Sequence, residues 1–512
     1  MTKISRALIS VSDKRNIEKI VAYLNQNKIE IISTGGTYKK IKESSENVLE
    51  ISEYTNFPEI MNGRVKTLNP LIHGGVLADR DNEQHKKDMN KHEIKPIDLV
   101  IVNLYPFEEV VLAGADYKTA IENIDVGGPT MIRAAAKNHQ HVVVVTDPSD
   151  YDELIKELES NDNQTSLSFR KKMAIKAFAK TAKYDHAIHN WFVAGEDELN
   201  LSAKLKQELR YGENPHQKAK LYQISATGIL AAEQIQGKEL SFNNIKDADS
   251  AYNLIKEFTK PAVAVIKHAN PCGVASADAI EEAFKKALSC DPTSSFGGII
   301  ALNRSLDKEL ALLIKASFYE VVITPEISME AKDILAAKKN MRILITGSEQ
   351  KLASKQISSI EGGILVQDAD SKEVLEADLE VVSKRKPSKS ELDNMLFAFK
   401  AVKHVRSNAV LFAKNQMTVA IGAGQMSRVD SVRVASLKLE DFSKNNKSFD
   451  FNELVLASDA FFPFSDGLEL AAKAGAKAII QPGGSIRDQE VIAKADELGL
   501  ALVFTKTRHF KH

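Results

Sequence analysis

Short β-branched apolar runs alternate with longer stretches of helical periodicity along the first part of the chain. The first run covers residues 7–11, and four apolar residues then recur at helical spacing: Ile17, Ile20, Val21 and Leu24. Further apolar runs at 29–32, 99–102 and 142–145 each end in a polar turn. This alternation predicts a parallel α/β sheet, and open sheets of this kind bind ligands beyond the carboxyl ends of their strands.

The rest of the chain repeats this alternation after a break near residue 200. A helical pattern at 167–192 gives way to the polar run 195–198, which indicates a linker and predicts domains at 1–199 and 200–512. The second domain exceeds the usual size, so we expect two subdomains with a break near 368–390. Its predicted strands cover 262–266, 321–323, 343–345, 364–366, 409–412, 478–480 and 500–504, and helical patterns cover 392–405 and 467–474.

Charge and cysteine content narrow the possible functions. The chain has 512 residues, with 68 Lys and Arg against 69 Asp and Glu. This balance gives no general attraction for nucleic acid or for an acidic membrane surface. The only cysteines, Cys272 and Cys290, exclude a disulfide framework and indicate a reducing compartment, so we expect a cytoplasmic protein. No apolar stretch reaches the roughly 18 residues of a membrane span.

Two segments of the first domain suit a bound phosphate. Residues 10–14 and 33–37 lie where a strand feeds a helix, and they combine hydroxyls with open backbone N–H groups. The alternative is that these residues only cap helices and turn the chain. Ligand binding is favoured by the other segments that accompany these two. They are 64–68 and 73–75, which add cations and flexible glycines, Tyr105 after a strand, the turn 125–129 and the helical segment 133–139 that follows it. Asp125 itself either caps a helix or faces a ligand.

The second domain contains a candidate acid/base pair. An apolar strand delivers Lys267 and His268 into a turn that we expect Pro271 and Gly273 to form. A titratable pair at the carboxyl end of a strand suits proton transfer. Because successive strand residues point to opposite faces, the two side chains share a site only if the chain turns between or just after them.

Three better-known motifs fail on spacing. Gly422 and Gly424 begin a dinucleotide fingerprint, but Ser427 stands where its third glycine belongs, and no Walker lysine pattern occurs. The turn after His268 is like that of a zinc deaminase, yet Ala275 replaces the second cysteine and Asn270 the glutamate. We therefore expect neither a nicotinamide nor an ATP site, and no catalytic metal.

The order and spacing of these motifs over residues 3–512 resemble the bifunctional purine biosynthesis family. That family joins phosphoribosylaminoimidazolecarboxamide formyltransferase to inosine monophosphate cyclohydrolase. The matching segments also include 294–298, 407–408, 422–425, 461–466 and 508–512. The resemblance implies an α/β protein with a methylglyoxal-synthase-like cyclohydrolase domain, followed by two cytidine-deaminase-like subdomains that transfer the formyl group. It also implies 10-formyltetrahydrofolate as co-substrate, nucleotide and folate as small-molecule partners, and a homodimer.

The resemblance also implies roles for individual residues. For ring closure, the implied catalytic residues are Lys66, Tyr105, Asp125 and Lys137, and the implied phosphate contacts are Ser12, Lys14, Ser33, Thr34, Gly36, Thr37, Arg64 and Thr67. For formyl transfer, the implied catalytic residues are Lys267, His268 and Asn408. The residues that line this second site are Arg210, Tyr211, Asn243, Phe296, Gly297, Glu320, Gln425, Arg428, Phe462 and Arg508.

The chemistry of the two reactions suggests what some of these groups do. His268 can take the proton of the attacking amine while Lys267 stabilises the oxyanion, and Asn408 orients either the substrate carboxamide or the histidine. Asp125 is our choice for the general base of ring closure. The alternative function is a non-catalytic nucleotide-binding regulatory protein that keeps only the phosphate loops. The Lys267–His268 pair, together with Asp125 and Lys137, counts against it.

Overall fold

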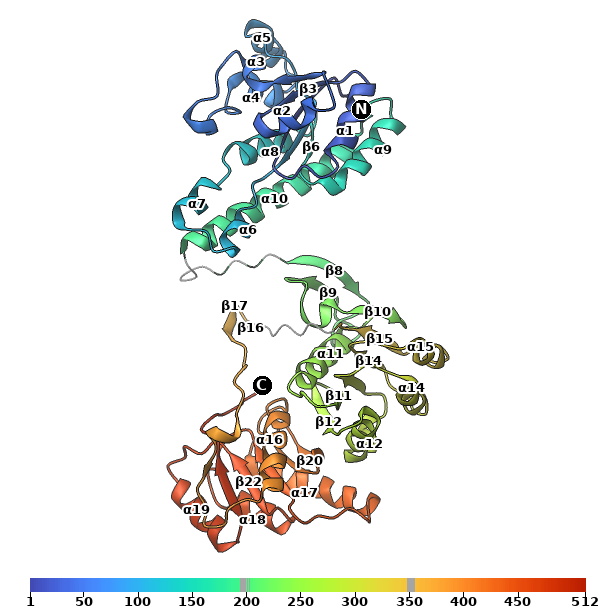
Figure 1. Cartoon of the computed structure of the whole chain (residues 1–512), viewed down its shortest axis with the longest axis vertical. Helices are drawn as coiled ribbons and strands as arrows, with labels where there is room; N and C mark the ends of the chain where they lie inside the picture. Colours follow the sequence, from blue (N-terminus) through green and yellow to red (C-terminus); the bar gives the residue numbers. More distant parts are fainter. Residues whose placement is uncertain (194–198, 200, 202, 348–354) are drawn as a thin grey trace. The chain divides into compact units, whose positions relative to one another are not determined.

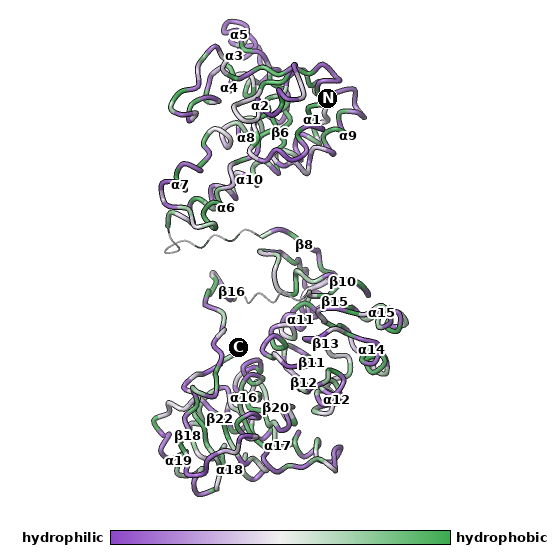
Figure 2. Tube along the Cα trace, viewed as in Figure 1, coloured by the Kyte–Doolittle hydropathy of each residue, from purple (hydrophilic) through white to green (hydrophobic). Residues whose placement is uncertain are grey.

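The computed structural model describes residues 1–193, 199, 201, 203–347 and 355–512. The chain forms two compact units, Met1–Ser202 and Ala203–His512 (Figure 1). The polar run at 195–198, where we expect the linker, lies outside the described residues. Among the described residues no helix is long and apolar enough to cross a membrane, and the hydrophobic stretches along the trace in Figure 2 are short.

The first unit is built on a five-stranded parallel sheet, as the sequence predicts. Its strand order is β4-β3-β2-β5-β6. The strands are β2 (Arg6–Val11), β3 (Glu30–Ser33), β4 (Val48–Glu50), β5 (Leu99–Asn103) and β6 (Val143–Val145), and a separate short pair joins β1 (Thr2–Lys3) to β7 (Gln164–Thr165). From β2 the order runs outward through β3 to β4 on one side and through β5 to β6 on the other. The carboxyl ends of β2 and β5 therefore form a switch point of the sheet.

Helices cover both faces of this sheet, because its strands are apolar on both sides. One buried cluster packs beneath α1 (Ile17–Gln26), α2 (Gly35–Lys42) and α9 (Tyr151–Ser160). The opposite cluster packs beneath α4 (Pro70–Leu77), α8 (Gly127–Lys137) and α10 (Leu167–Val193). The remaining helices are α3 (Ile51–Thr55), α5 (Glu83–Lys91), α6 (Phe107–Leu112) and α7 (Tyr117–Glu122).

The second unit contains a twelve-stranded mixed sheet made of two halves with the same topology. The order is β10-β15-β14-β13-β11-β12 in one half and β20-β19-β21-β22-β23-β18 in the other. The halves join edge to edge through β12 and β20, where Ala275 lies opposite Met417. Each half contains an antiparallel hairpin, an antiparallel neighbour and two further parallel strands. The predicted α/β architecture is thereby confirmed.

The elements of the two halves follow one another in the same order along the chain. The first half contains β10 (Glu233–Gln236), α11 (Phe242–Ile255), β11 (Ala262–Lys267), β12 (Asn270–Ser276), α12 (Ile280–Cys290), α13 (Pro292–Ser295), β13 (Ile299–Leu302), α14 (Lys308–Lys315), β14 (Val321–Thr324), α15 (Met329–Leu335) and β15 (Arg342–Ile345). The second contains β18 (Glu380–Val381), α16 (Lys389–Val402), β19 (Val410–Lys414), β20 (Met417–Gly422), α17 (Arg428–Asn445), β21 (Val455–Ser458), α18 (Asp466–Lys473), β22 (Ala478–Gln481), α19 (Asp488–Glu497) and β23 (Ala501–Phe504). Only α13 has no counterpart among these.

Two hairpins stand outside the large sheet. They are β8 (Lys204–Leu209) with β9 (Ala219–Gln223), and β16 (Lys355–Ile360) with β17 (Gly363–Asp368). The predicted strand at 364–366 lies in the second hairpin rather than in the large sheet. Helix α16 starts at 389 rather than at the expected 392, because Ser388 and Glu391 form a capping box.

The turn that follows Lys267 differs from the prediction in its residues. The chain does turn directly after Lys267, but the two turn residues are His268 and Ala269, with φ of 53° and 57°. The prediction that Pro271 and Gly273 form this turn is wrong, since both lie in β12. Gly273 serves packing instead, because a Cβ there would lie 1.9 Å from the carbonyl oxygen of Ala287.

Candidate active sites

A cavity of about 630 Å³ opens at the carboxyl ends of the parallel strands in the first unit. It lies at the switch point, since residues at the ends of β2 and β5 and just after β3 line it. Ten of the twelve residues that the sequence assigns to ring closure line this cavity: Ser12, Lys14, Thr34, Gly36, Thr37, Arg64, Lys66, Thr67, Tyr105 and Asp125. Ser33 and Lys137 do not line it.

The two segments predicted to bind phosphate are held by side chains that form hydrogen bonds with the backbone. The Thr37 hydroxyl donates to the Val11 carbonyl (2.9 Å) and accepts from the Val11 N–H (3.0 Å), which fixes α2 against the end of β2. The hydroxyl of Ser33 is buried and donates to the Ile9 carbonyl at 2.8 Å. Ser33 therefore joins two strands instead of facing the cavity.

Asn103 also lines this cavity, although the sequence analysis does not single it out. Its Oδ1 accepts hydrogen bonds from the N–H groups of Ser12 (2.6 Å) and Asp13 (2.9 Å), and its Nδ2 donates to the Asp13 carbonyl (2.8 Å). Asn103 thus holds the 12–14 loop in place and also lines the cavity. Its position at the end of a buried strand, two residues before Tyr105, is a signal that could have identified it.

Asp125 is held as a partly buried carboxylate at the N-terminus of α8. Its Oδ1 accepts from the Gly128 N–H at 2.8 Å, and its own N–H donates to the Tyr184 hydroxyl at 2.7 Å. Burial raises the pKa of Asp125, although the N–H groups of Gly128 and Tyr105 and the charge of Lys66 oppose this. A Cβ at position 128 would lie 2.4 Å from Oδ2 of Asp125. Only glycine at position 128 allows this close approach. Asp125 is thereby held as a carboxylate suited to proton transfer.

The structure brings Lys66 and Tyr105 to the same cavity but leaves Lys137 elsewhere. The Lys66 Nζ lies 3.9 Å from the Glu59 carboxylate, and Tyr105 is 45% exposed. Lys137 is exposed at the last turn of α8, whose first turn borders the cavity. At 1.5 Å per residue, the length of α8 puts Lys137 roughly 15 Å from that first turn. Lys137 therefore does not share this cavity with Asp125, and its catalytic role stays a prediction.

A smaller pocket of about 250 Å³ in the second unit contains the candidate acid/base pair. Its lining residues are Lys267, His268, Asn270, Pro271, Cys272, Ser294, Ile421, Ala423, Val434 and Lys438. They come from both halves of the large sheet, so the pocket lies where β12 meets β20. Lys267 donates from Nζ to the Phe296 carbonyl at 2.9 Å, a neutral partner. Burial raises the pKa of Cys272 to about 12, which leaves this thiol protonated and unreactive.

Asn408 is oriented by its neighbours in the second half. Its Oδ1 accepts from Arg428 Nη2 at 2.9 Å, and its Nδ2 donates to the Gln425 carbonyl at 3.0 Å. Arg428 is buried and also forms an ion pair with the buried Asp459. Within the described residues, the side-chain bonds of Asn408 thus join it to Arg428, Gln425 and Met426 rather than to a histidine.

The other residues expected at the transferase site lie on several surfaces. Arg210 lies over the ring of Tyr211 with 4.7 Å between guanidinium carbon and ring centroid, and Asn243 joins this loop to α11 through the Glu213 carbonyl. Further residues that do not line the small pocket are Phe296, Gly297, Glu320, Phe462 and Arg508. The Phe296 ring is 59% exposed, whereas Phe462 is only 1% exposed and packs in the core. In this conformation Phe462 does not line the small pocket, and its expected place at the transferase site stays a prediction.

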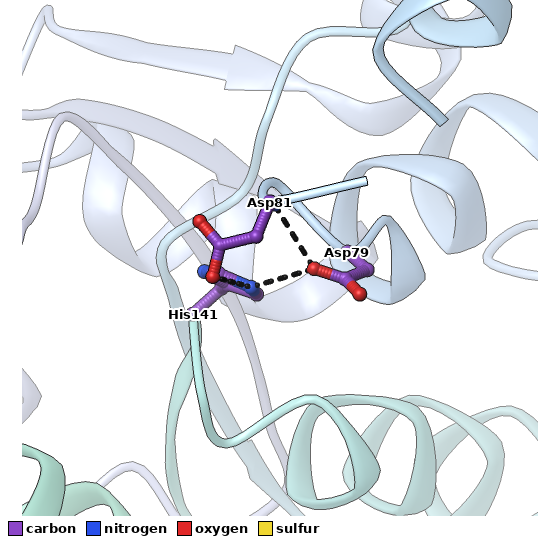
Figure 3. Close-up of side chains that lie close together, drawn as sticks. All are labelled: Asp79, Asp81 and His141. Atoms are coloured by element: carbon purple, nitrogen blue, oxygen red, sulfur yellow. Dashed lines mark hydrogen bonds and ion pairs between the residues drawn. The ribbon is translucent and has the colours of Figure 1, made fainter. Parts of the chain in front are cut away.

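One group of side chains in the described part of the chain has a geometry that could hold a metal ion. It consists of Asp79, Asp81 and His141, whose ligand atoms lie within 4.8 Å of one another (Figure 3). His141 Nε2 lies 3.0 Å from Asp79 Oδ1, and Asn138 Nδ2 donates to the carbonyls of Val76 and Ala78 nearby. These contacts brace one turn against another. None of the three lines either cavity, and the absence of a catalytic metal stays a prediction.

Comparisons with known proteins agree with the resemblance. A family model described as AICARFT/IMPCHase bienzyme matches residues 135–438, and a model of the MGS-like domain matches residues 16–130. The bifunctional purine biosynthesis protein PurH of Rhodospirillum rubrum is 53% identical over 520 residues, covering 99% of this chain and 99% of its own. The PurH proteins of Brucella canis and Brucella melitensis biotype 2 are 52% identical over 524 residues, covering 100% of this chain and 97% of theirs.

A solved structure, the crystal structure of ForH, is 35% identical and covers 37% of this chain and 99% of its own, but its TM-score of 0.33 carries no argument. The MGS-like match confirms the predicted kind of N-terminal domain. Nothing in these comparisons supports the non-catalytic alternative. One family model covers more than half of the chain, and the relatives align along nearly all of it. The chain therefore belongs to the AICARFT/IMPCHase bienzyme family, the bifunctional transferase and cyclohydrolase enzymes of purine biosynthesis.

Proposed function

We propose that this chain transfers a formyl group from 10-formyltetrahydrofolate to 5-aminoimidazole-4-carboxamide ribonucleotide, and then closes the product to inosine monophosphate with loss of water. The observation that carries the proposal is the cavity at the switch point of the first unit. It combines phosphate-binding loops with a cation, a phenol and a partly buried carboxylate, namely Lys66, Tyr105 and Asp125. We assign ring closure to domain 1–199 and formyl transfer to domain 200–512.

Ring closure needs groups that move protons and balance charge. The carboxamide nitrogen attacks the formyl carbon, and the resulting carbinolamine then loses water. Asp125 suits the role of general base, because burial raises its pKa toward the working pH while backbone N–H groups hold it in place. Lys66 balances the negative charge that develops on the former formyl oxygen, and Tyr105 is available to protonate the leaving hydroxyl.

Formyl transfer needs a base for a poorly nucleophilic amine. The amine lone pair is delocalised through the imidazole ring onto the carboxamide, so attack on the formyl carbon requires removal of a proton. His268 takes that proton, while the Lys267 ammonium stabilises the oxyanion. The bond from the formyl carbon to N10 of the folate then breaks, and N10 accepts a proton. Lys267 and His268 line one pocket, which supports this division of roles.

We further propose that the enzyme works in the cytoplasm as a homodimer and uses no catalytic metal. The two-cysteine composition supports a reducing compartment. Both candidate reactions are proton transfers and carbonyl additions, for which the lysines, the histidine and the carboxylate of the two cavities supply charge and acid/base groups.

The direct test is to incubate the purified full chain with the ribonucleotide and 10-formyltetrahydrofolate. Tetrahydrofolate release measures the first reaction, and chromatographic detection of inosine monophosphate measures the second. We expect both products in equal amounts at completion. Nucleotide binding without turnover would refute the proposal.

A further inference from the structure

The two halves of the large sheet contain equivalent hairpins with different turn residues. In the first half β11 ends at Lys267, which pairs with Asn270, so the turn consists of His268 and Ala269. In the second half β19 ends at Lys414, which pairs with Met417, and the turn consists of two residues between them, Asn415 and Gln416. The chain therefore supplies its own comparison for the hairpin that carries the candidate acid/base pair.

Both turns need left-handed backbone at their two central residues. The φ values are 53° and 57° for His268 and Ala269, and 53° and 56° for Asn415 and Gln416. Such two-residue turns favour Asn or Gly, which adopt this conformation readily. Asn415 meets that preference, whereas neither His268 nor Ala269 does, so the first turn needs support from outside the hairpin.

Asp247 on α11 supplies that support. Its Oδ2 accepts from the His268 N–H at 3.1 Å, and its Oδ1 accepts from the Ala269 N–H at 2.8 Å. At the equivalent place on α16, Asn394 Oδ1 accepts from the Gln416 N–H at 2.9 Å. In the first half, a carboxylate thus accepts two backbone hydrogen bonds from the turn, whereas in the second half an amide oxygen accepts one.

The lysines before the two turns also differ. Lys414 is 5% exposed and donates to both the carbonyl and the carboxylate of Asp450 at 2.8 Å, so its charge is neutralised. Lys267 is half-buried, faces the pocket and donates to a neutral carbonyl. The first hairpin therefore presents its lysine, bonded to a neutral group, to a pocket, whereas the lysine of the second hairpin is buried in an ion pair.

We infer that Asp247 is a positioning residue for formyl transfer, because its carboxylate fixes the strained His268–Ala269 turn and so keeps His268 beside Lys267 at one pocket. This inference rests on the proposed function of His268. Asp247 does not line the pocket, so it acts through the turn rather than on the substrate. A displacement of about 1 Å in a catalytic group costs up to roughly 100-fold in rate, which makes the effect measurable.

The test compares Asp247→Ala with its counterpart Asn394→Ala in the full chain. Asp247→Ala should lower kcat for formyl transfer about 10- to 100-fold while KM for either substrate changes less than about threefold. Asp247→Asn should recover most of the loss, because an amide oxygen supports the equivalent turn at position 394. Asn394→Ala should lower thermal stability and leave kcat for transfer unchanged. Ring closure of supplied intermediate should be unchanged in all three variants.

A transfer rate near wild type in Asp247→Ala would overturn the inference, as would an equal loss of kcat in Asn394→Ala. His268→Ala separates this outcome from failure of the proposed function: if it transfers normally, the assignment of His268 itself is wrong. If Asp247→Ala does not fold, the double variant with Ala269→Gly relieves the turn strain, since glycine adopts positive φ freely. That variant should fold but still transfer slowly, because glycine permits the turn conformation without fixing it and His268 stays unanchored. Transfer at the wild-type rate by this variant would show that the Asp247 bonds are not needed to position His268, and would overturn the inference.

Discussion

Replacing Asp125 with asparagine removes a charge from the first cavity while changing its shape very little. Asparagine keeps an oxygen that can accept from the Gly128 N–H, now 2.8 Å from Oδ1, and its backbone N–H can still donate to Tyr184. What the variant loses is the ability to take up a proton. The change therefore tests the base rather than the fold of the loop.

The expected loss follows from the role of the group. A positioned general base contributes about 10²–10⁴ in rate, or roughly 3–5 kcal/mol of barrier. The folding stability of the variant, in contrast, should not fall. Burial raises the pKa of Asp125 in the folded state, so its contribution to stability is present at low pH and lost as pH rises through the folded pKa. At pH 7 the buried charge disfavours folding, and Asp125→Asn should melt no lower than wild type.

The assay supplies the formylated ribonucleotide and follows inosine monophosphate across a pH series. In wild type the rate should rise with pH through a pKa above the ordinary 3.8 of aspartate, and the variant should lack this rise. Formyl transfer by the variant is the internal control. Ring closure near the wild-type rate, or loss of both activities in a folded protein, would show that Asp125 is not the base.

Two further predictions concern the same unit. Asn103→Ala removes the acceptor for the Ser12 and Asp13 N–H groups, so KM for the formylated ribonucleotide should rise roughly 5- to 150-fold, from about 1–3 kcal/mol of lost support. Asn138→Ala also removes two bonds to backbone but away from the cavity, and it should lower thermal stability without changing KM. Exhaustive chelation should leave both reaction rates unchanged, because Asp79, Asp81 and His141 line neither cavity. A rate lost on chelation and restored by zinc would contradict this.

The sequence predicts most elements whose apolar pattern is long and regular. The helix expected at 167–192 is α10, Leu167–Val193, and the strand expected at 99–102 is β5. It does not reveal β12 or β20, because Pro271, Gly273 and Gly422 suggest turns. Tertiary packing explains the glycines: a Cβ at 422 would lie 1.9 Å from the Ser431 carbonyl of α17. Such contacts join residues that no local pattern links.

The difference between local sequence patterns and tertiary contacts applies to the candidate sites as well. Charged residues at a strand end, such as Lys267, or in a turn, such as Lys66 and Asp125, stand out because charged groups there have no packing role. A motif does not say which end of a helix or which side of a turn faces a cavity, and Lys137 and Phe462 line neither cavity. Positioning residues such as Asp247 were missed, because they act on a backbone segment that folding alone brings near.

The central claim is that two separate sites carry the two reactions, and His268→Ala tests it most directly. The variant should fold, transfer formyl groups about 10²–10⁴-fold more slowly than wild type, and close supplied intermediate at the wild-type rate. Its imidazole lines the pocket of the second unit, while the cavity with Asp125 lies wholly in the first. Formyl transfer at the wild-type rate, or a parallel loss of ring closure in the folded variant, would contradict the account.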